Sequence, residues 1–380
     1  MDTEYLVVFE NCLDDSVALV GGKSTGLGSM IRAGIPVPPG FAVTTRAYRA
    51  MLEEGALDHE IAELLDRADP DDVAGLEEIS RSIAALIEGS AIPADVEAEI
   101  RQGYDMLASV SCGGTDANGR DLDLPVAVRS SATVEDLPDA SFAGQQDTFL
   151  WIVGADSVLE HVRRCWSSLY TARAIAYRIE KGYHREKIHM SVVIQKMVNA
   201  RAAGVMFTLN PINGDRSKVA IDASWGLGEA VASGEVTPDN YLVDTIAMRI
   251  AKRTVSSKAI EYRANPATER IERTVVPPER RDAPCLADEE ILTLSRLARR
   301  VEAHHGRPQD LEWAIDADLE PPDNIVLLQS RPETVWSDRD RKQVSRGDRS
   351  TMDHIVANLL AGVRLRHGDS DTDNIGGVLG

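Results

Sequence analysis

The feature that most constrains the fold is a change in the spacing of apolar residues along the chain. Residues 45–108 repeat apolar side chains at helical spacing and carry many Asp and Glu residues between them, which predicts a helical subdomain. From there the period shortens to about two, as in β-strands, in the runs 126–129, 191–198, 204–208 and 219–222. Further helices are predicted at about 155–181 and 288–304. The pattern predicts an α+β or α/β enzyme rather than a helical bundle or a β-sandwich.

Length and composition exclude several classes of protein. A chain of 380 residues can form two or three subdomains. No apolar run approaches the roughly 18–20 residues that a membrane helix needs, and the first ten residues lack the features of a secretory signal. The net charge of −20 disfavours nucleic acid or an anionic membrane as a partner. The four cysteines lack metal-ligand spacing, so we expect reduced thiols in a cytoplasmic protein.

A glycine-rich segment, residues 21–28, follows a strand predicted at 4–9 and precedes a helix predicted to reach about Ala33. Gly22-Lys23-Ser24 is similar to the end of a Walker A motif, but Val17 stands where that motif needs its first glycine. A P-loop is therefore disfavoured. Two interpretations remain, a flexible glycine turn that presents Lys23 to phosphate and a glycine-rich helix start with a solvated lysine.

The second chemical segment is a strand that ends in Arg129 and continues through hydroxyl and acidic residues into a loop of small residues. The arginine fork matches phosphate oxygens. In the loop, Gly144 allows backbone N–H groups to approach an anion closely, and Thr148 adds a hydroxyl group. The segment predicts a phosphate site. The alternative is a structural ion pair between Arg129 and Glu135 or Asp136.

The third segment is the apolar strand 192–198, which carries Gln195 as one polar side chain among apolar ones. Such a strand can form one wall of a slot for an adenine ring, with backbone groups reading the edge of the base. A plain core strand is the alternative.

The fourth segment is a pair of closing strands at 310–316 and 325–330. Alternation places Asp310 and Glu312 on one face of the first strand, and Gln329 shares a face with Arg331 on the second. If the strands pair in antiparallel fashion, two carboxylates, an amide oxygen and a guanidinium gather in one patch. Hard oxygen ligands beside an arginine suit Mg²⁺ that bridges nucleotide phosphates. The alternative is a surface hairpin with a solvated polar face.

Taken in order, these segments resemble the ATP-grasp nucleotide-binding domain of the phosphoenolpyruvate synthase, pyruvate phosphate dikinase and rifampin phosphotransferase family. The resemblance covers about residues 5–336. It is carried by the motifs at 21–24 with 34–41, 128–132 with 136–145, 195–198, 204–211, 226–229, 308–313 and 329–332.

The resemblance implies Mg-ATP as the ligand and a role for each candidate residue. Lys23, Arg129 and Arg331 would act on the triphosphate, and the loop around Gly144 and Thr148 would cover it. Gln195 and the backbone of Met197 and Val198 would face adenine. Glu312 and Gln329 would carry Mg²⁺.

The resemblance also implies a domain organisation. We expect an ATP-grasp fold of two to three subdomains, the first at 1–190 with a helical insertion at about 45–110, the second at 191–336. A linker, an amphipathic helix at 350–363 and a flexible tail would occupy 337–380. The long acidic turn at 316–324 departs from the family pattern. It leaves Glu312 and Gln329 in register only if the extra residues loop out.

No histidine stands in the sequence context of a phosphate carrier. The resemblance implies that phosphate passes to a histidine on a swivelling domain, so we expect that histidine on a separate partner subunit. The helix at 350–363 would dock this subunit or, alternatively, pack on its own chain. That subunit would pass phosphate to a small acceptor, with release of AMP and phosphate. Similarity to the subunits of phenylphosphate synthase favours a phenol-type acceptor. The alternatives are pyruvate or an antibiotic as acceptor, a self-sufficient kinase, a carboxylate–amine ligase and an ATP-sensing subunit without turnover.

Overall fold

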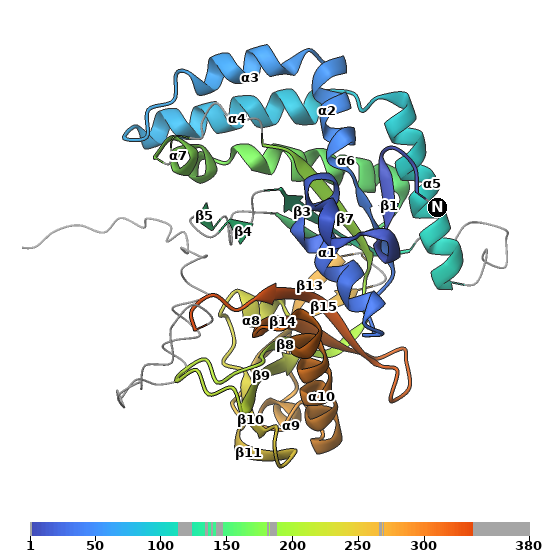
Figure 1. Cartoon of the computed structure of the whole chain (residues 1–380), viewed down its shortest axis with the longest axis vertical. Helices are drawn as coiled ribbons and strands as arrows, with labels where there is room; N and C mark the ends of the chain where they lie inside the picture. The colour runs from blue at the N-terminus through green and yellow to red at the C-terminus, as the bar shows by residue number, and fades with distance from the viewer. Residues whose placement is uncertain are drawn as a thin grey trace, which may run out of the picture.

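The structure is a computed structural model of the chain (Figure 1). It describes residues 2–112, 124–133, 136–137, 140–141, 147–180, 182, 188–265, 268 and 270–336. Gly144 and the helix predicted at 350–363 lie outside the described residues. None of the described helices is both long enough and apolar enough to span a bilayer.

The first sheet has five antiparallel strands in the order β1-β2-β7-β3-β6. Their bounds are β1 Leu6–Val8, β2 Gly40–Val43, β7 Met190–Lys196, β3 Val126–Ala132 and β6 Thr148–Ile152. A short pair, β4 (Asp136–Leu137) and β5 (Ala140–Ser141), follows β3. Because β7 lies in the middle of this sheet, the chain leaves the first sheet after Lys196. The expected boundary at 190/191 falls too early.

Helices cover the face of the first sheet that is turned away from the second sheet (Figure 1). They are α2 (Thr45–Glu54), α3 (Leu57–Leu65), α4 (Val73–Gly89), α5 (Ala94–Cys112), α6 (Ala155–Ser167) and α7 (Ala172–Glu180). The helices predicted over 45–108 are thus present. The single helix predicted at 155–181 is wrong, because a 3-10 turn, η3 (Ser168–Tyr170), interrupts it. Thr171 then adopts an extended backbone, and its hydroxyl accepts a hydrogen bond from the N–H of Ala174 at the start of α7.

The second sheet has six antiparallel strands in the order β11-β10-β9-β8-β14-β15. Their bounds are β11 Arg249–Thr254, β10 Asp239–Asp244, β9 Lys218–Trp225, β8 Ala200–Phe207, β14 Gln309–Asp316 and β15 Ile325–Pro332. The helix α10 (Asp288–His305) packs on one face through a shared core that includes Leu294, Val301 and Trp313. Its N-cap is Ala287, and the Glu290 carboxylate accepts a hydrogen bond from the N–H of Ala287. Smaller elements are α8 (Glu229–Ala232), α9 (Pro278–Arg281) and the hairpin β12 (Ile260–Asn265) with β13 (Arg270–Val275).

The glycine-rich segment lies inside α1 (Val17–Arg32), after η1 (Phe9–Asn11) and η2 (Asp14–Ser16). The prediction of a glycine turn before the helix is therefore wrong in its position. The break falls within α1, at Gly21, whose φ of 74° interrupts the helical backbone. Beyond the break, α1 lies between the two sheets, and its residues Leu27 and Met30 share a core with Leu327 of β15. This helix carries Lys23 into the space between the sheets.

Candidate functional site

The polar patch predicted on the closing strands forms as expected. In the antiparallel pair of β14 and β15, Glu312 lies opposite Gln329 and Asp310 lies opposite Arg331. The alternating residues Leu311 and Trp313 face the core beneath α10. Alternation therefore turns the polar side chains of β14 towards the first sheet.

A β-bulge in β15 sets the orientation of Gln329. Trp313 pairs with Leu327, whereas the preceding Glu312 pairs with Gln329, so Leu328 is an extra residue. Leu327 faces the α10 core, and strict alternation would turn Gln329 into the same core. The bulge shifts the alternation by one residue and brings Gln329 to the side of Glu312. The acidic turn lies outside this ladder, so it leaves the two residues in register.

Arg129 joins the two sheets at this patch. Its neighbours Val126 and Val128 pack into the core under the helices, so Arg129 extends from the opposite face of β3. Nη2 donates to Glu312 Oε2 at 2.9 Å and to Gln329 Oε1 at 2.7 Å, and Nη1 donates to the carbonyl oxygen of Leu328 at 3.4 Å. The Arg129 side chain is only 11% exposed. The Glu312 side chain is 38% exposed, so water screens this ion pair from the side of the carboxylate.

The pKa values of the two neighbouring carboxylates, Glu312 and Asp310, shift in opposite directions. Burial alone would raise the pKa of Glu312, but the guanidinium groups of Arg129 and Arg331 outweigh it and hold the pKa below its usual value. Burial raises the pKa of Asp310 to about 7, because Arg331 offsets it only in part and Glu312 and Glu333 add to the rise. Near neutral pH, Glu312 is therefore ionised, whereas Asp310 is close to its pKa.

Lys23 is held beside Arg129 by the strand β3. Its Nζ donates to the carbonyl oxygen of Ser130 at 2.7 Å, and its backbone N–H donates to the hydroxyl of Ser131 at 3.2 Å. Gly21 makes this contact possible, since a Cβ there would lie 2.2 Å from Ser131 Oγ. Ser130 and Ser131 were not among the site residues predicted from the sequence. Their place directly after Arg129 was the available signal.

The strand predicted to face adenine, β7, presents its polar residue Gln195 on the face of the sheet that carries Arg129. Val192 and Ile194 pack under the helices, so Gln195 lies on the same face of the sheet as Arg129. Gln195 is 3% exposed, and its Nε2 donates to the carbonyl of Pro38 at 3.3 Å, so its side chain braces the proline connector. Contact with a base would require that bond to break.

Met197 and Val198 follow β7 in the chain and carry backbone groups without a hydrogen-bond partner among the described residues. Among the described residues, the N–H of Val198 donates no hydrogen bond and the carbonyl of Met197 accepts none, whereas the N–H of Met197 donates to Pro125. These two groups belong to one trans peptide bond and point in opposite directions, so at most one of them can meet the edge of a base. An apolar cluster of Val198, Ala203, Leu227, Ala314 and Val326, with Met197 and Leu328 at its margin, supplies a wall.

The remaining candidates lie at the edges of this site. Thr148 is exposed and stands opposite Arg129 in the β3–β6 pair, so its hydroxyl lies near the predicted phosphate position. Arg331 is half-buried opposite Asp310.

The fit of a metal ion can be judged from two oxygens. Glu312 Oε2 and Gln329 Oε1 both accept from one guanidinium nitrogen, so they converge on a single cationic point. A carboxylate and an amide oxygen are ligands that Mg²⁺ accepts. Within the described ranges no three His, Cys, Asp or Glu side chains form a metal cluster. The pair therefore fits a cation that takes its other ligands from phosphate and water.

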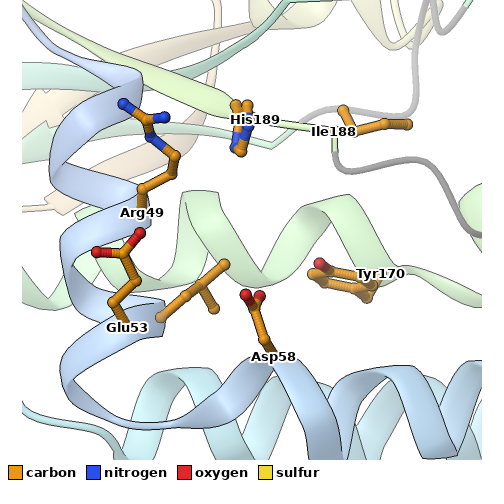
Figure 2. A pocket seen from close by; sticks show the side chains of 7 residues that line it. Arg49, Glu53, Asp58, Tyr170, Ile188 and His189 are labelled. Carbon is orange, nitrogen blue, oxygen red and sulfur yellow. The ribbon is translucent and has the colours of Figure 1, made fainter.

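A separate cavity of about 200 Å³ lies beside α2 and α3, next to Tyr170 and His189 (Figure 2). Leu52, Tyr170 and Ile188 form its apolar part, and its polar groups are Arg49, Glu53, Asp58 and His189. Acidic and basic groups are mixed around it, so it lacks the concentrated positive charge that a triphosphate requires. We therefore assign phosphate to the Lys23–Arg129 site.

A lysine and two arginines beside a carboxylate–amide pair and an apolar wall define a nucleotide phosphate-binding protein. Comparison with known families agrees. The chain belongs to the family described as pyruvate phosphate dikinase, AMP/ATP-binding domain, which matches residues 17–352.

Curated relatives support the same family. The chain is 44% identical over 361 residues to a probable phosphoenolpyruvate synthase of Staphylothermus marinus, covering 90% of this chain and 43% of the relative. It is 45% identical over 336 residues to that of Methanothermobacter thermautotrophicus, covering 87% and 46%. It is 39% identical over 372 residues to phosphoenolpyruvate synthase of Pyrococcus furiosus, covering 88% and 44%. The chain thus spans less than half the length of these relatives.

A crystal structure of the D-cycloserine synthetase DcsG aligns with 88% of this chain and 67% of that one, at 10% identity and a TM-score of 0.24. A likeness of this size carries no argument about the fold.

Proposed function

We propose that this chain has an ATP-grasp fold, binds Mg-ATP between its two sheets and activates it for transfer of a phosphoryl group to a histidine of a swivelling-domain subunit. The observation that carries the proposal is the convergence of Lys23, Arg129 and Arg331 with the Glu312–Gln329 pair beside an apolar wall. Membership of a family of AMP/ATP-binding domains supports it.

The residues would act mainly by position and charge. Lys23 and Arg129 lie close enough to hold one triphosphate, and Arg331 adds a third cation. Their charges would stabilise the phosphoryl oxygens as the bond to the leaving group breaks. Glu312 and Gln329 would hold Mg²⁺, which neutralises phosphate charge when bound. Burial of Arg129 strengthens its attraction to phosphate by removing competing water.

For the acceptor we keep two candidates. Similarity of a separate ATP-binding chain to phenylphosphate synthase subunits supports a phenol-type compound. The relatives named phosphoenolpyruvate synthase support pyruvate. In both cases water takes up the second phosphate, so the products from ATP are AMP and phosphate.

The test is product analysis with and without a histidine-bearing partner. AMP and phosphate that form only with the partner support the proposal, whereas ADP formed by this chain alone would establish a self-sufficient kinase. Assays with phenol and with pyruvate then separate the two acceptors. ATP binding without any turnover would identify a sensing subunit.

Two variants test the site and the docking element. Arg129→Ala should abolish turnover with the fold intact, and Arg201→Ala, which removes an arginine paired with Glu290 and the carbonyl of Cys285, should retain it. Deletion of residues 350–380, which lie outside the described residues, should weaken co-purification with the partner while ATP binding survives. Normal activity of Arg129→Ala would contradict the phosphate role.

A further inference from the structure

The guanidinium of Arg129 occupies the point on which the two proposed metal ligands converge. One nitrogen, Nη2, donates to both Glu312 Oε2 and Gln329 Oε1, at 2.9 and 2.7 Å. Mg²⁺ binds its oxygen ligands at about 2.0–2.1 Å, so an ion on both oxygens would lie within about 5 Å of Nη2. Two like charges at that distance in a buried site repel strongly.

The arginine is not locked in this position by a full set of bonds. Among the described residues its Nε is buried without a hydrogen-bond partner. Its third contact, from Nη1 to the carbonyl of Leu328, is long at 3.4 Å. A phosphate oxygen could satisfy these donors better, because arginine binds phosphate through parallel charge-assisted hydrogen bonds.

Arg129 contacts both oxygens of the Glu312–Gln329 pair through Nη2. The other two cations have different positions: Lys23 Nζ donates to the carbonyl oxygen of Ser130, and Arg331 lies opposite Asp310 in the strand pair. Movement of Arg129 to phosphate would therefore free both oxygens for a cation.

From these contacts we propose that Arg129 is an internal counter-ion that excludes divalent metal from the empty site and moves to phosphate when ATP enters. The inference rests on the proposed function. Metal and nucleotide then bind cooperatively, since the nucleotide removes the competitor of the metal. In the nucleotide-free site, the guanidinium of Arg129 thus offsets the charge of Glu312 in place of a metal ion.

The decisive measurement is the affinity for Mn²⁺ without nucleotide at pH 8. Electron paramagnetic resonance detects the free Mn²⁺ that remains. Arg129→Ala should bind Mn²⁺ about ten- to hundredfold more tightly than the wild type, because it lacks the charge-assisted bonds that the metal must replace. Arg129→Lys keeps a competing charge and should fall between them. The matched control Arg201→Ala, which also loses an ion pair, should bind Mn²⁺ as the wild type does.

An unchanged or weaker Mn²⁺ affinity in Arg129→Ala would overturn the proposal. If that variant is unstable, Arg129→Gln replaces it, since the amide can still donate to Glu312 but carries no charge. Tighter Mn²⁺ binding in Arg129→Gln supports the proposal, and unchanged or weaker binding overturns it.

A second measurement separates this inference from the proposed function. A non-hydrolysable ATP analogue should strengthen Mn²⁺ binding in the wild type, whereas adenosine, which lacks phosphates, should leave it unchanged. If the analogue does not bind at all, the proposed function fails. If it binds but Arg129→Ala shows wild-type Mn²⁺ affinity without nucleotide, only the counter-ion role fails.

Discussion

Replacement of Gly21 by alanine tests how α1 positions Lys23. Gly21 has a φ of +74°, and a Cβ there would lie 2.2 Å from Ser131 Oγ and 2.5 Å from the Ser131 carbonyl oxygen. Ordinary contacts begin near 3.5 Å, so α1 and β3 must separate by about 1 Å. The separation would break the hydrogen bonds that hold Lys23 to Ser130 and Ser131.

The cost has two parts. The backbone of Gly21, with φ 74° and ψ 166°, lies in a region that costs a residue with a Cβ about 1–3 kcal/mol, and overpacking of a tight contact adds about 1–3 kcal/mol. The free energy of unfolding should therefore fall by about 2–6 kcal/mol. Displacement of one charged phosphate contact should weaken ATP binding by about ten- to hundredfold.

The matched control is Gly306→Ala at the C-cap of α10. Gly306 also has a positive φ, +68°, with a ψ of 8° in the left-handed helical region, but no atom lies within 4 Å of its Cβ position. This control should lose only about 1–2 kcal/mol and keep its ATP affinity. Urea unfolding and titration calorimetry with ATP measure both quantities. Equal stability losses, or normal ATP binding by Gly21→Ala, would refute the close-approach argument.

Two further predictions concern buried charges. The raised pKa of Asp310, about 7, means that its folded form keeps a proton that the unfolded chain has released, so its contribution to stability falls as pH rises from about 4 to 7. The fall is at most about 4 kcal/mol, and Asp310→Asn should flatten it in urea titrations; an unchanged pH profile would contradict the shift. Lys258→Ala should lower the unfolding free energy by about 3–5 kcal/mol, because it leaves the fully buried Asp239 without its cation. A loss below 1 kcal/mol in thermal or urea unfolding would show that the remaining donors to Asp239 suffice.

The elements that the sequence predicted well are those fixed by local alternation. Leu311 and Trp313 are apolar, so burial forces Asp310 and Glu312 to the other face wherever β14 packs. The helices over residues 45–108 follow from the same logic at the helical period. In both cases the burial of one face decides the structure, and that face can be read from neighbouring residues.

The single helix predicted at 155–181 shows where this logic ends. Apolar spacing continues across Ser168–Tyr170, so periodicity alone gives no reason to stop. The interruption depends on the side chain of Thr171, which caps α7, and on the burial of Tyr170 against Tyr48, whose hydroxyl lies 3.1 Å away. A partner 122 positions distant in the sequence decides between one helix and two.

The site itself depends on two local irregularities of this kind. The bulge at Leu328 reverses the direction that strict alternation gives to Gln329, and the break at Gly21 lets α1 approach Ser131. Both irregularities are selected by contacts with distant segments, since Arg129 and Glu312 stand 183 positions apart. Sequence alternation could therefore predict which residue types form the patch, but not which of them share a cation. In the structure that shared cation is Arg129. Because it bonds both Glu312 and Gln329, it would compete with a metal ion for the same two oxygens.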